Sequence, residues 1–320
     1  MMQSSTERIA SVSLDLDNKW AYMRSSKIEG WEDYPTYLDV AVPRVLDFLS
    51  RRALTITFFI VGKDASLAKN HEAIASIAKA GHEIGNHSFN HEPWLHLYSR
   101  SELDTEIGQA ETAIENVTGQ RPRGFRGPGF SLTPAVVEVL AERGYVYDCS
   151  VFPTFIGPLA RAFYFLKSGK MTPEERELRK RLFGKFSDGF QSLEPSEISS
   201  QGRKLVEIPV TTLPIFKTPI HVSYFMYLAS FSTAAAKAYW KTALGLCRVT
   251  NVAPSLLLHP LDFLSREDVP ELEFFPGMSV PTNKKLQMLE WVFDSMERHF
   301  KIVPICQHVN EVLRQLSGSK

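Results

Sequence analysis

Two aspartates at the end of a β-rich segment are the first candidates for chemistry. In residues 12–17, the period of two that a strand imposes sends Ser13, Asp15 and Asp17 to one face and the apolar residues to the other. Two carboxylates this close repel each other strongly when they are shielded from water. The pair therefore needs a cation or a shared proton. An aspartate at this position can equally serve a turn before Asn18, because Asp readily stabilises turns.

Two histidines follow the end of another predicted strand, at residues 82–86. His87 and His91 lie four residues apart, and one helical turn would place both imidazoles on the same face. Two histidines and one carboxylate, with a position left for water, are typical of catalytic zinc, although the same set suits iron, cobalt or nickel. We interpret the nearby His82 and His96 as packing or surface histidines.

An arginine and a further histidine also follow predicted strands. Arg126, in the strand end at residues 124–127, can pair bidentately with a buried carboxylate and so keep Asp15 ionised, unless it is a solvated loop arginine. His259 follows the apolar segment 255–258. An isolated histidine is usually structural, but the end of a late barrel strand is where catalytic groups lie.

The elements that would position these residues alternate between strand and helix, which is typical of βα units around a parallel sheet. Predicted strands occupy residues 12–17, 54–61, 82–86, 124–127, 145–150, 205–210, 255–258 and 302–306. Predicted helices occupy residues 42–52, 66–80, 101–117, 134–143, 233–247 and 283–300. Seven or eight parallel strands favour a closed barrel, formed by a single domain over residues 1–320 with a helical insertion at 154–203.

Taken in order, the motifs resemble the signature of the NodB-type polysaccharide deacetylases, carbohydrate esterase family four. The matching residues are Asp15-x-Asp17, His87-x-x-x-His91, Arg126-x-Pro128, Tyr147-Asp148-x-Ser150 and Leu257-Leu258-His259-Pro260. The resemblance implies an α/β fold, a distorted (β/α)7 barrel, that binds zinc or another divalent metal such as Co²⁺, Ni²⁺ or Fe²⁺.

The resemblance also implies roles for individual residues. The metal ligands would be Asp17, His87 and His91. Asp15 would be the general base, Arg126 would hold that base, His259 would be the general acid and Asp148 would orient His259. The implied activity is removal of the acetyl group from an N-acetylated sugar in a polysaccharide, an oligosaccharide or a lipid-linked glycan precursor.

Two alternatives to this activity stay open. Related barrels act on formyl or non-sugar amides, so a metal-dependent amidase or deformylase is one of them. A carbohydrate-binding homologue without catalysis is the other, although the presence of Asp15, Arg126 and His259 beside all three ligands argues against it.

The composition bounds the class of protein and its partners. With 320 residues and 44% hydrophobic content, the chain can bury a full core. Lys plus Arg and Asp plus Glu each total 36, so the overall charge gives no reason to expect a nucleic-acid partner. The three cysteines, Cys149, Cys247 and Cys306, have neither metal nor redox spacing and are expected to be small buried hydrophobes.

The first residues contain no apolar run of signal-peptide length, so we expect a cytoplasmic protein that acts on an intracellular glycan precursor. The segments 152–166 and 224–231 are rich in aromatic residues. They predict either ordinary core packing or a rim that touches the inner membrane face, which would suit a lipid-linked sugar. The sequence leaves the oligomeric state open.

Overall fold

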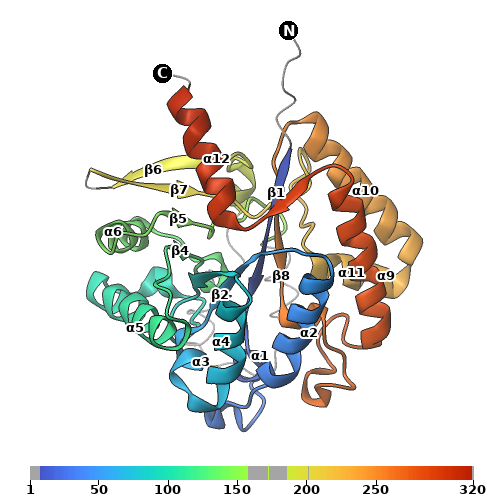
Figure 1. Ribbon diagram of the computed structural model, residues 1–320, viewed down its shortest axis with the longest axis horizontal. Helices are drawn as coiled ribbons and strands as arrows, with labels where there is room; N and C mark the ends of the chain where they lie inside the picture. The colour runs from blue at the N-terminus through green and yellow to red at the C-terminus, as the bar shows by residue number, and fades with distance from the viewer. Residues whose placement is uncertain (1–7, 158–171, 173–185, 201, 319–320) are drawn as a thin grey trace.

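The computed structural model describes residues 8–157, 172, 186–200 and 202–318 (Figure 1). Within them nine strands form one sheet, in the order β6-β7-β5-β4-β3-β2-β1-β8, with β9 also paired to β1. The strands are β1 (Ile9–Asp15), β2 (Thr57–Ile60), β3 (Glu83–Asn86), β4 (Gly124–Phe125), β5 (Tyr147–Asp148), β6 (Ser196–Ser200), β7 (Arg203–Glu207), β8 (Ser255–Leu258) and β9 (Lys301–Val303). Every pair is parallel except β6–β7.

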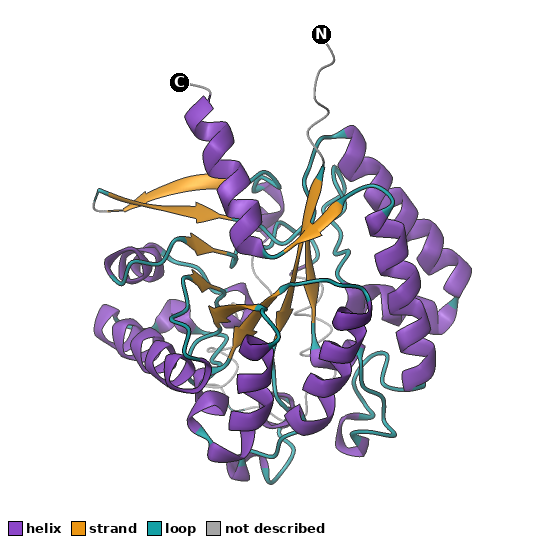
Figure 2. Ribbon diagram, viewed as in Figure 1, coloured by secondary structure: helices purple, strands orange, loops and turns teal. Residues whose placement is uncertain are grey.

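Helices surround these strands on the outside (Figure 2). Their bounds are α1 (Lys19–Ser25), α2 (Leu38–Arg51), α3 (Gly62–Ser66), α4 (His71–Lys79), α5 (Arg100–Thr118), α6 (Pro134–Glu142), α9 (Val222–Phe231), α10 (Thr233–Val249), α11 (Thr282–Glu297) and α12 (Ile305–Gly318). Local sequence explains their ends: α5 begins at a capping box between Ser99 and Glu102 and ends at Gly119 in the left-handed region. The six predicted helices are present within a few residues, whereas α1, α3, α9 and α12 were not predicted.

The sheet curls into a half-barrel, and the predicted distorted (β/α)7 barrel is confirmed. The strand ladder runs from β6 to β8 without pairing these two ends. The segment after β7 spans the remaining gap: the Thr211 N–H donates to the Ser255 carbonyl at 3.0 Å, and the Ser255 N–H donates to Thr211 Oγ1 at 2.7 Å. The expectation of a fully closed ladder is wrong, because this side of the barrel is joined through an irregular segment.

Helix α12 covers the amino ends of the barrel strands. Its residues Ile305 and Val309 are buried in one cluster with Phe59 of β2. Ser11, near the start of β1, lies 2.9 Å from His308 Nδ1 of the same helix. The prediction of a strand over residues 302–306 is wrong for its last three residues, because β9 ends at Val303 and α12 begins at Ile305. The carboxyl ends of the strands are left for the site.

The predicted insertion at 154–203 lies largely outside the described residues. Its described end is not helical, because residues 196–200 form strand β6 against β7. An ion pair of 2.7 Å between Glu197 and Lys204 joins the two strands, and Ile198 packs on the barrel cluster below. Figure 1 shows this antiparallel pair projecting beside α6.

The aromatic segments divide between core and surface. In α9 the side chains of Phe225 and Met226 are buried, whereas Tyr227 and Phe231 are 41% and 75% exposed. Much of the segment 152–166 is outside the described residues. Within the described parts of the chain, no helix combines the length and apolar character needed to cross a bilayer.

Candidate active site

The two aspartates leave β1 at the carboxyl end of the barrel, as the period of two predicted. Val12 and Leu14 are buried in the large apolar cluster, while Ser13 and Asp15 point to the opposite side and meet Arg126. The register pairs Leu14 with Leu258 of β8. The next residues along the two parallel strands, Asp15 and His259, therefore emerge side by side at one edge.

Asn18, rather than either aspartate, makes the turn after β1. Its side chain accepts a hydrogen bond from Lys19 N at the start of α1 and another from Tyr37 N. Its amide donates to Asp64 Oδ1 at 2.7 Å. The turn reading of the aspartate pair is thus wrong, because a neighbouring residue provides the cap and leaves both carboxylates free to face the barrel.

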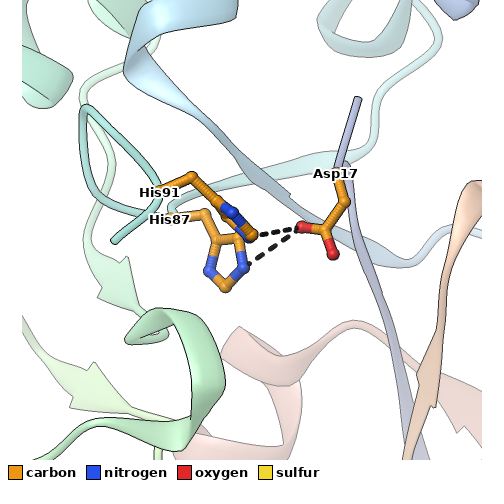
Figure 3. Close-up of side chains that lie close together, drawn as sticks. All are labelled: Asp17, His87 and His91. Carbon is orange, nitrogen blue, oxygen red and sulfur yellow. Dashed lines mark ion pairs between the residues drawn. The ribbon is translucent and has the colours of Figure 1, made fainter. Parts of the chain in front are cut away.

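His87 and His91 lie on an irregular loop after β3, and not on the helical turn that their spacing predicted. Ser88 and His91 have φ values of 61° and 54°, which interrupt any right-handed helix. The two imidazole rings still come together, with centroids 5.0 Å apart. Figure 3 shows both rings pointing toward the carboxylate of Asp17.

Buried polar groups from two helices hold this loop. Glu106 of α5 accepts hydrogen bonds from the backbone N–H groups of Phe89 and Asn90, at 3.0 and 2.6 Å. Arg24 of α1 donates to the carbonyls of Asn90 and His91, at 2.9 and 2.8 Å. The unusual backbone at His91 is therefore fixed by partners on both sides.

Asp17, His87 and His91 form a group that could hold a metal ion, with one ligand atom from each within 4.8 Å of the others. Asp17 Oδ1 lies 2.9 Å from His91 Nε2 and 3.4 Å from His87 Nε2. This oxygen is buried, and no donor among the described residues makes a well-aligned hydrogen bond to it. Two imidazoles facing an orphaned carboxylate oxygen fit a divalent cation.

The surroundings of His87 orient it as metal ligands usually are. His87 Nδ1 lies 2.7 Å from the Arg126 carbonyl, so this nitrogen carries the proton and Nε2 is left to face Asp17. Burial lowers the pKa of His87, but the charge of Asp15 and the contact with Asp17 outweigh it and raise the pKa. Burial raises the pKa of Asp17, but the charge of His91 and the close contacts with both rings bring it well below its usual value.

Arg126 pairs with Asp15, but through one nitrogen and not in the bidentate manner predicted. Its Nη1 donates to Asp15 Oδ1 at 2.6 Å and to Ser13 Oγ at 2.8 Å, and its Nε donates to the Cys149 carbonyl at 3.0 Å. The guanidinium also lies over the ring of Phe59, 4.4 Å from its centroid. Arg126 is fully buried, so it neutralises Asp15 inside the barrel instead of at the surface.

Asp148 does not reach His259, and the prediction that it orients this histidine is wrong. Its carboxylate accepts hydrogen bonds from the Ser150 N–H and hydroxyl, both at 2.8 Å. It also lies beside Glu207 on β7, and burial raises the pKa of both carboxyls. Because Ser150 Oγ accepts the Gly127 N–H, Asp148 acts on the loop that follows Arg126.

His259 is held by two residues that the sequence analysis missed. Its Nδ1 lies 3.2 Å from Ser223 Oγ at the start of α9, and its backbone N–H donates to Asp262 Oδ2 at 2.8 Å. Asp262 stands three residues after His259, with Pro260 between, a capping pattern that could have been recognised. Ser223 offers no comparable signal.

The two histidines interpreted as structural have packing contacts. His82 Nδ1 accepts the Ile56 N–H at 3.2 Å, and its ring lies 5.1 Å from that of Phe58. His96 contacts Ser131 Oγ through its backbone N–H at 3.0 Å.

Part of the sequence matches a known protein family. The sequence model of the polysaccharide deacetylase family matches residues 30–147, which include His87, His91 and Arg126. This segment of the chain is therefore similar to that family. Asp15, Asp17 and His259 lie outside the matched segment, and the strand register and contacts described above bring them to it.

Curated deacetylases are similar over part of their length. The peptidoglycan deacetylase of Helicobacter pylori is 26% identical over 170 residues, which are 51% of this chain and 54% of that protein. A peptidoglycan-N-acetylglucosamine deacetylase of Bacillus cereus is 34% identical over 115 residues, 35% of this chain and 48% of that protein. The chain therefore spans about half the length of these relatives.

A solved structure of a candidate polysaccharide deacetylase from Mycobacterium smegmatis shares the fold. It superposes with a TM-score of 0.64 at 20% identity, covering 98% of this chain and 93% of the other. At this identity the likeness establishes the deacetylase fold over nearly the whole chain.

Proposed function

We propose that this chain is a metal-dependent N-deacetylase that hydrolyses the acetamido group of an N-acetylated sugar. The observation that carries the proposal is the convergence of two differently paired carboxylates at one barrel edge. Asp17 faces His87 and His91, while Asp15, 3.9 Å from His87 Nε2, is paired with Arg126.

The geometry assigns a task to each residue. Water adds to the acyl carbon and gives a proton to Asp15, whose carboxylate Arg126 keeps in place. His259, which leaves β8 beside Asp15, gives a proton to the sugar nitrogen as the carbon–nitrogen bond breaks. The products are acetic acid, which ionises to acetate, and a free amine on the sugar. Asp15 then gives its proton to solvent and His259 takes one up, which restores the site.

Asp17, His87 and His91 would hold the divalent metal, and zinc is the first choice for a carboxylate and two imidazoles. When bound, the metal would lower the pKa of water and polarise the acyl carbonyl. Neighbouring residues hold the two histidines in place. The Arg126 carbonyl contacts the ring of His87, and the Arg24 side chain donates to the backbone carbonyl of His91.

Acetate release from N-acetylglucosamine oligomers tests the proposal. The zinc-loaded protein should release acetate, whereas Asp15→Asn and His259→Ala should lose nearly all turnover and still bind zinc. Full activity of either variant would overturn the assigned roles.

The same assay separates the two alternatives. An N-formyl oligomer that is turned over with a much higher kcat/KM than its N-acetyl counterpart would favour a deformylase. Binding of the oligomer without any acetate release would favour a non-catalytic carbohydrate-binding protein.

Substrate size and origin belong to the proposal as well. The relatives from Helicobacter pylori and Bacillus cereus are named for peptidoglycan, so a β-linked amino-sugar glycan is the proposed class of substrate. Comparing kcat/KM for oligomers of increasing length would distinguish a polymer substrate from a small precursor.

A further inference from the structure

The environment of His259 differs from the one that the motif order implied. Asp148 is committed to Ser150, so the imidazole must be oriented by another group. The contacts of His259 come from the start of α9 and from the turn that follows β8. These contacts decide which ring nitrogen carries the proton.

Hydrogen-bond directions can be assigned along a chain of three residues. The Ser223 hydroxyl donates its proton to Asp262 Oδ1 at 2.8 Å, so toward His259 Nδ1, 3.2 Å away, it can only accept. His259 Nδ1 must then carry a proton, which leaves Nε2 as the nitrogen that exchanges protons with a substrate.

Asp262 is fixed firmly enough to define this geometry. It is buried, and its second oxygen accepts the backbone N–H of His259 at 2.8 Å. The same turn is anchored by the buried Lys285, whose Nζ donates to the carbonyls of Leu261 and Leu264 at 2.7 and 2.6 Å. One carboxylate thus holds both the backbone and, through Ser223, the ring of His259.

We propose that Ser223 and Asp262 are positioning residues that orient His259 for proton delivery to the leaving nitrogen, the role that the family resemblance implied for Asp148. The inference rests on the proposed deacetylase function. In the reaction, the proton on Nε2 moves to the sugar nitrogen as that nitrogen takes the electrons of the broken bond. The proton on Nδ1 stays in the hydrogen bond to Ser223.

Two substrates with different leaving groups test this assignment. Replacing Ser223 with Ala should lower kcat for an N-acetylglucosamine tetramer by about 10- to 100-fold, part of the about 10²- to 10⁴-fold that general acid–base catalysis supplies, with KM nearly unchanged. Hydrolysis of 4-nitrophenyl acetate should change less than about twofold, because 4-nitrophenolate leaves without a proton. A parallel loss for both substrates would indicate structural damage and overturn the proposal.

Matched variants distinguish a loss of His259 orientation from a loss of folded structure. Ser230→Ala, on the same helix, removes an exposed hydroxyl that donates to the Tyr227 carbonyl and should behave as wild type. Ser223→Thr keeps the hydroxyl and should restore most of the amide activity. Asp262→Asn should reproduce the selective loss of Ser223→Ala. In a His259→Ala background, Ser223→Ala should cause no further loss, and an additive loss would contradict the relay.

Nitrogen-15 NMR of the histidine rings tests the relay without any turnover. The His259 signals, assigned by their absence in His259→Ala, should report a ring that carries a proton on Nδ1 and should change in Ser223→Ala. A ring protonated at Nε2 but not at Nδ1, or an unchanged spectrum in the variant, would overturn the relay. If the relay is seen by NMR but the wild type releases no acetate, the proposed function fails and the relay stands.

Discussion

Arg126 balances the charges of the site. It is fully buried, and its partner Asp15 is nearly so, with 2.6 Å between Nη1 and Oδ1. Burial lowers the pKa of Arg126, and the charge of Asp15 more than compensates, so the guanidinium stays protonated. A buried pair of this kind contributes little net stability while intact, but either partner alone is a buried uncompensated charge.

Replacing Arg126 with Met is therefore expected to destabilise the protein by about 3–5 kcal/mol, because Asp15 loses its counter-charge. Adding Asp15→Asn to this variant should recover much of the loss. Urea denaturation followed by circular dichroism measures both. Arg314→Met, which removes an exposed i,i+3 ion pair with Glu311, is the control and should leave the midpoint unchanged. A loss for Arg126→Met no larger than this control would contradict the account.

Individual site residues could be predicted only where the residue type and its spacing along the sequence are distinctive. Asp17, His87 and His91 could be grouped from the sequence because residue types that bind metals are few and their spacing is regular, and the structure brings the three together. Asp148 was assigned wrongly because its neighbour Ser150 satisfies both of its oxygens locally, which a motif does not reveal. Ser223 was missed because a serine 36 residues from its histidine has no distinguishing pattern.

At the scale of elements, close strand packing positions the Arg126 loop. Strand β4 consists of Gly124 and Phe125, and a Cβ on Gly124 would lie 1.9 Å from the ring of Tyr147 on β5. Tyr147 cannot move aside freely, because its hydroxyl donates to Glu83 Oε1 at 2.7 Å. The glycine therefore sets the approach of the two strands directly before Arg126.

Gly124→Ala should destabilise the protein by about 1–3 kcal/mol through overpacking, and it should lower activity by displacing Arg126. Gly245→Ala is the matched control, because its Cβ would meet no atom within 4 Å in the interior of α10. There alanine should stabilise the protein by about 0.5–1 kcal/mol. Thermal denaturation of the two variants should give shifts of opposite sign, and shifts of the same sign would contradict the packing argument.

Helices and strands were predicted best where the periodic pattern of hydrophobic residues extended over many residues. Strands β4 and β5 proved shorter than expected, because backbone groups after Phe125 and Asp148 turn to side-chain partners at the site. Helix α12 was missed although Ile305, Val309 and Val312 follow a helical spacing. Ile305 was assigned to the predicted terminal strand at 302–306 because β9 directly precedes it.

At the scale of the whole molecule, a family barrel presents its carboxyl edge for chemistry and carries exposed aromatic residues on α9. Tyr227 and Phe231 lie with ring centroids 5.1 Å apart and are largely uncovered. Phe225 of the same helix is buried, so core packing explains only part of the aromatic segment. Contact with a membrane surface stays a prediction for the exposed pair.

Flotation with phosphatidylglycerol vesicles tests this prediction. The wild type should float with the vesicles, and Phe231→Ser should reduce the bound fraction, because an interfacial aromatic side chain is lost. Val249→Ser is the control, since this residue is 85% exposed at the other end of α10. Absence of the wild type from the floating fraction, or equal effects of the two variants, would remove the membrane contact.

The central claim is that Asp17, His87 and His91 together hold one divalent cation. Calorimetric titration of chelator-treated protein with zinc tests it most directly. We expect one equivalent to bind to the wild type and to Asp15→Asn, and binding to be weakened by more than about 100-fold in His91→Ala. Equal zinc affinity of His91→Ala and the wild type, or no zinc binding by the wild type, would contradict the account.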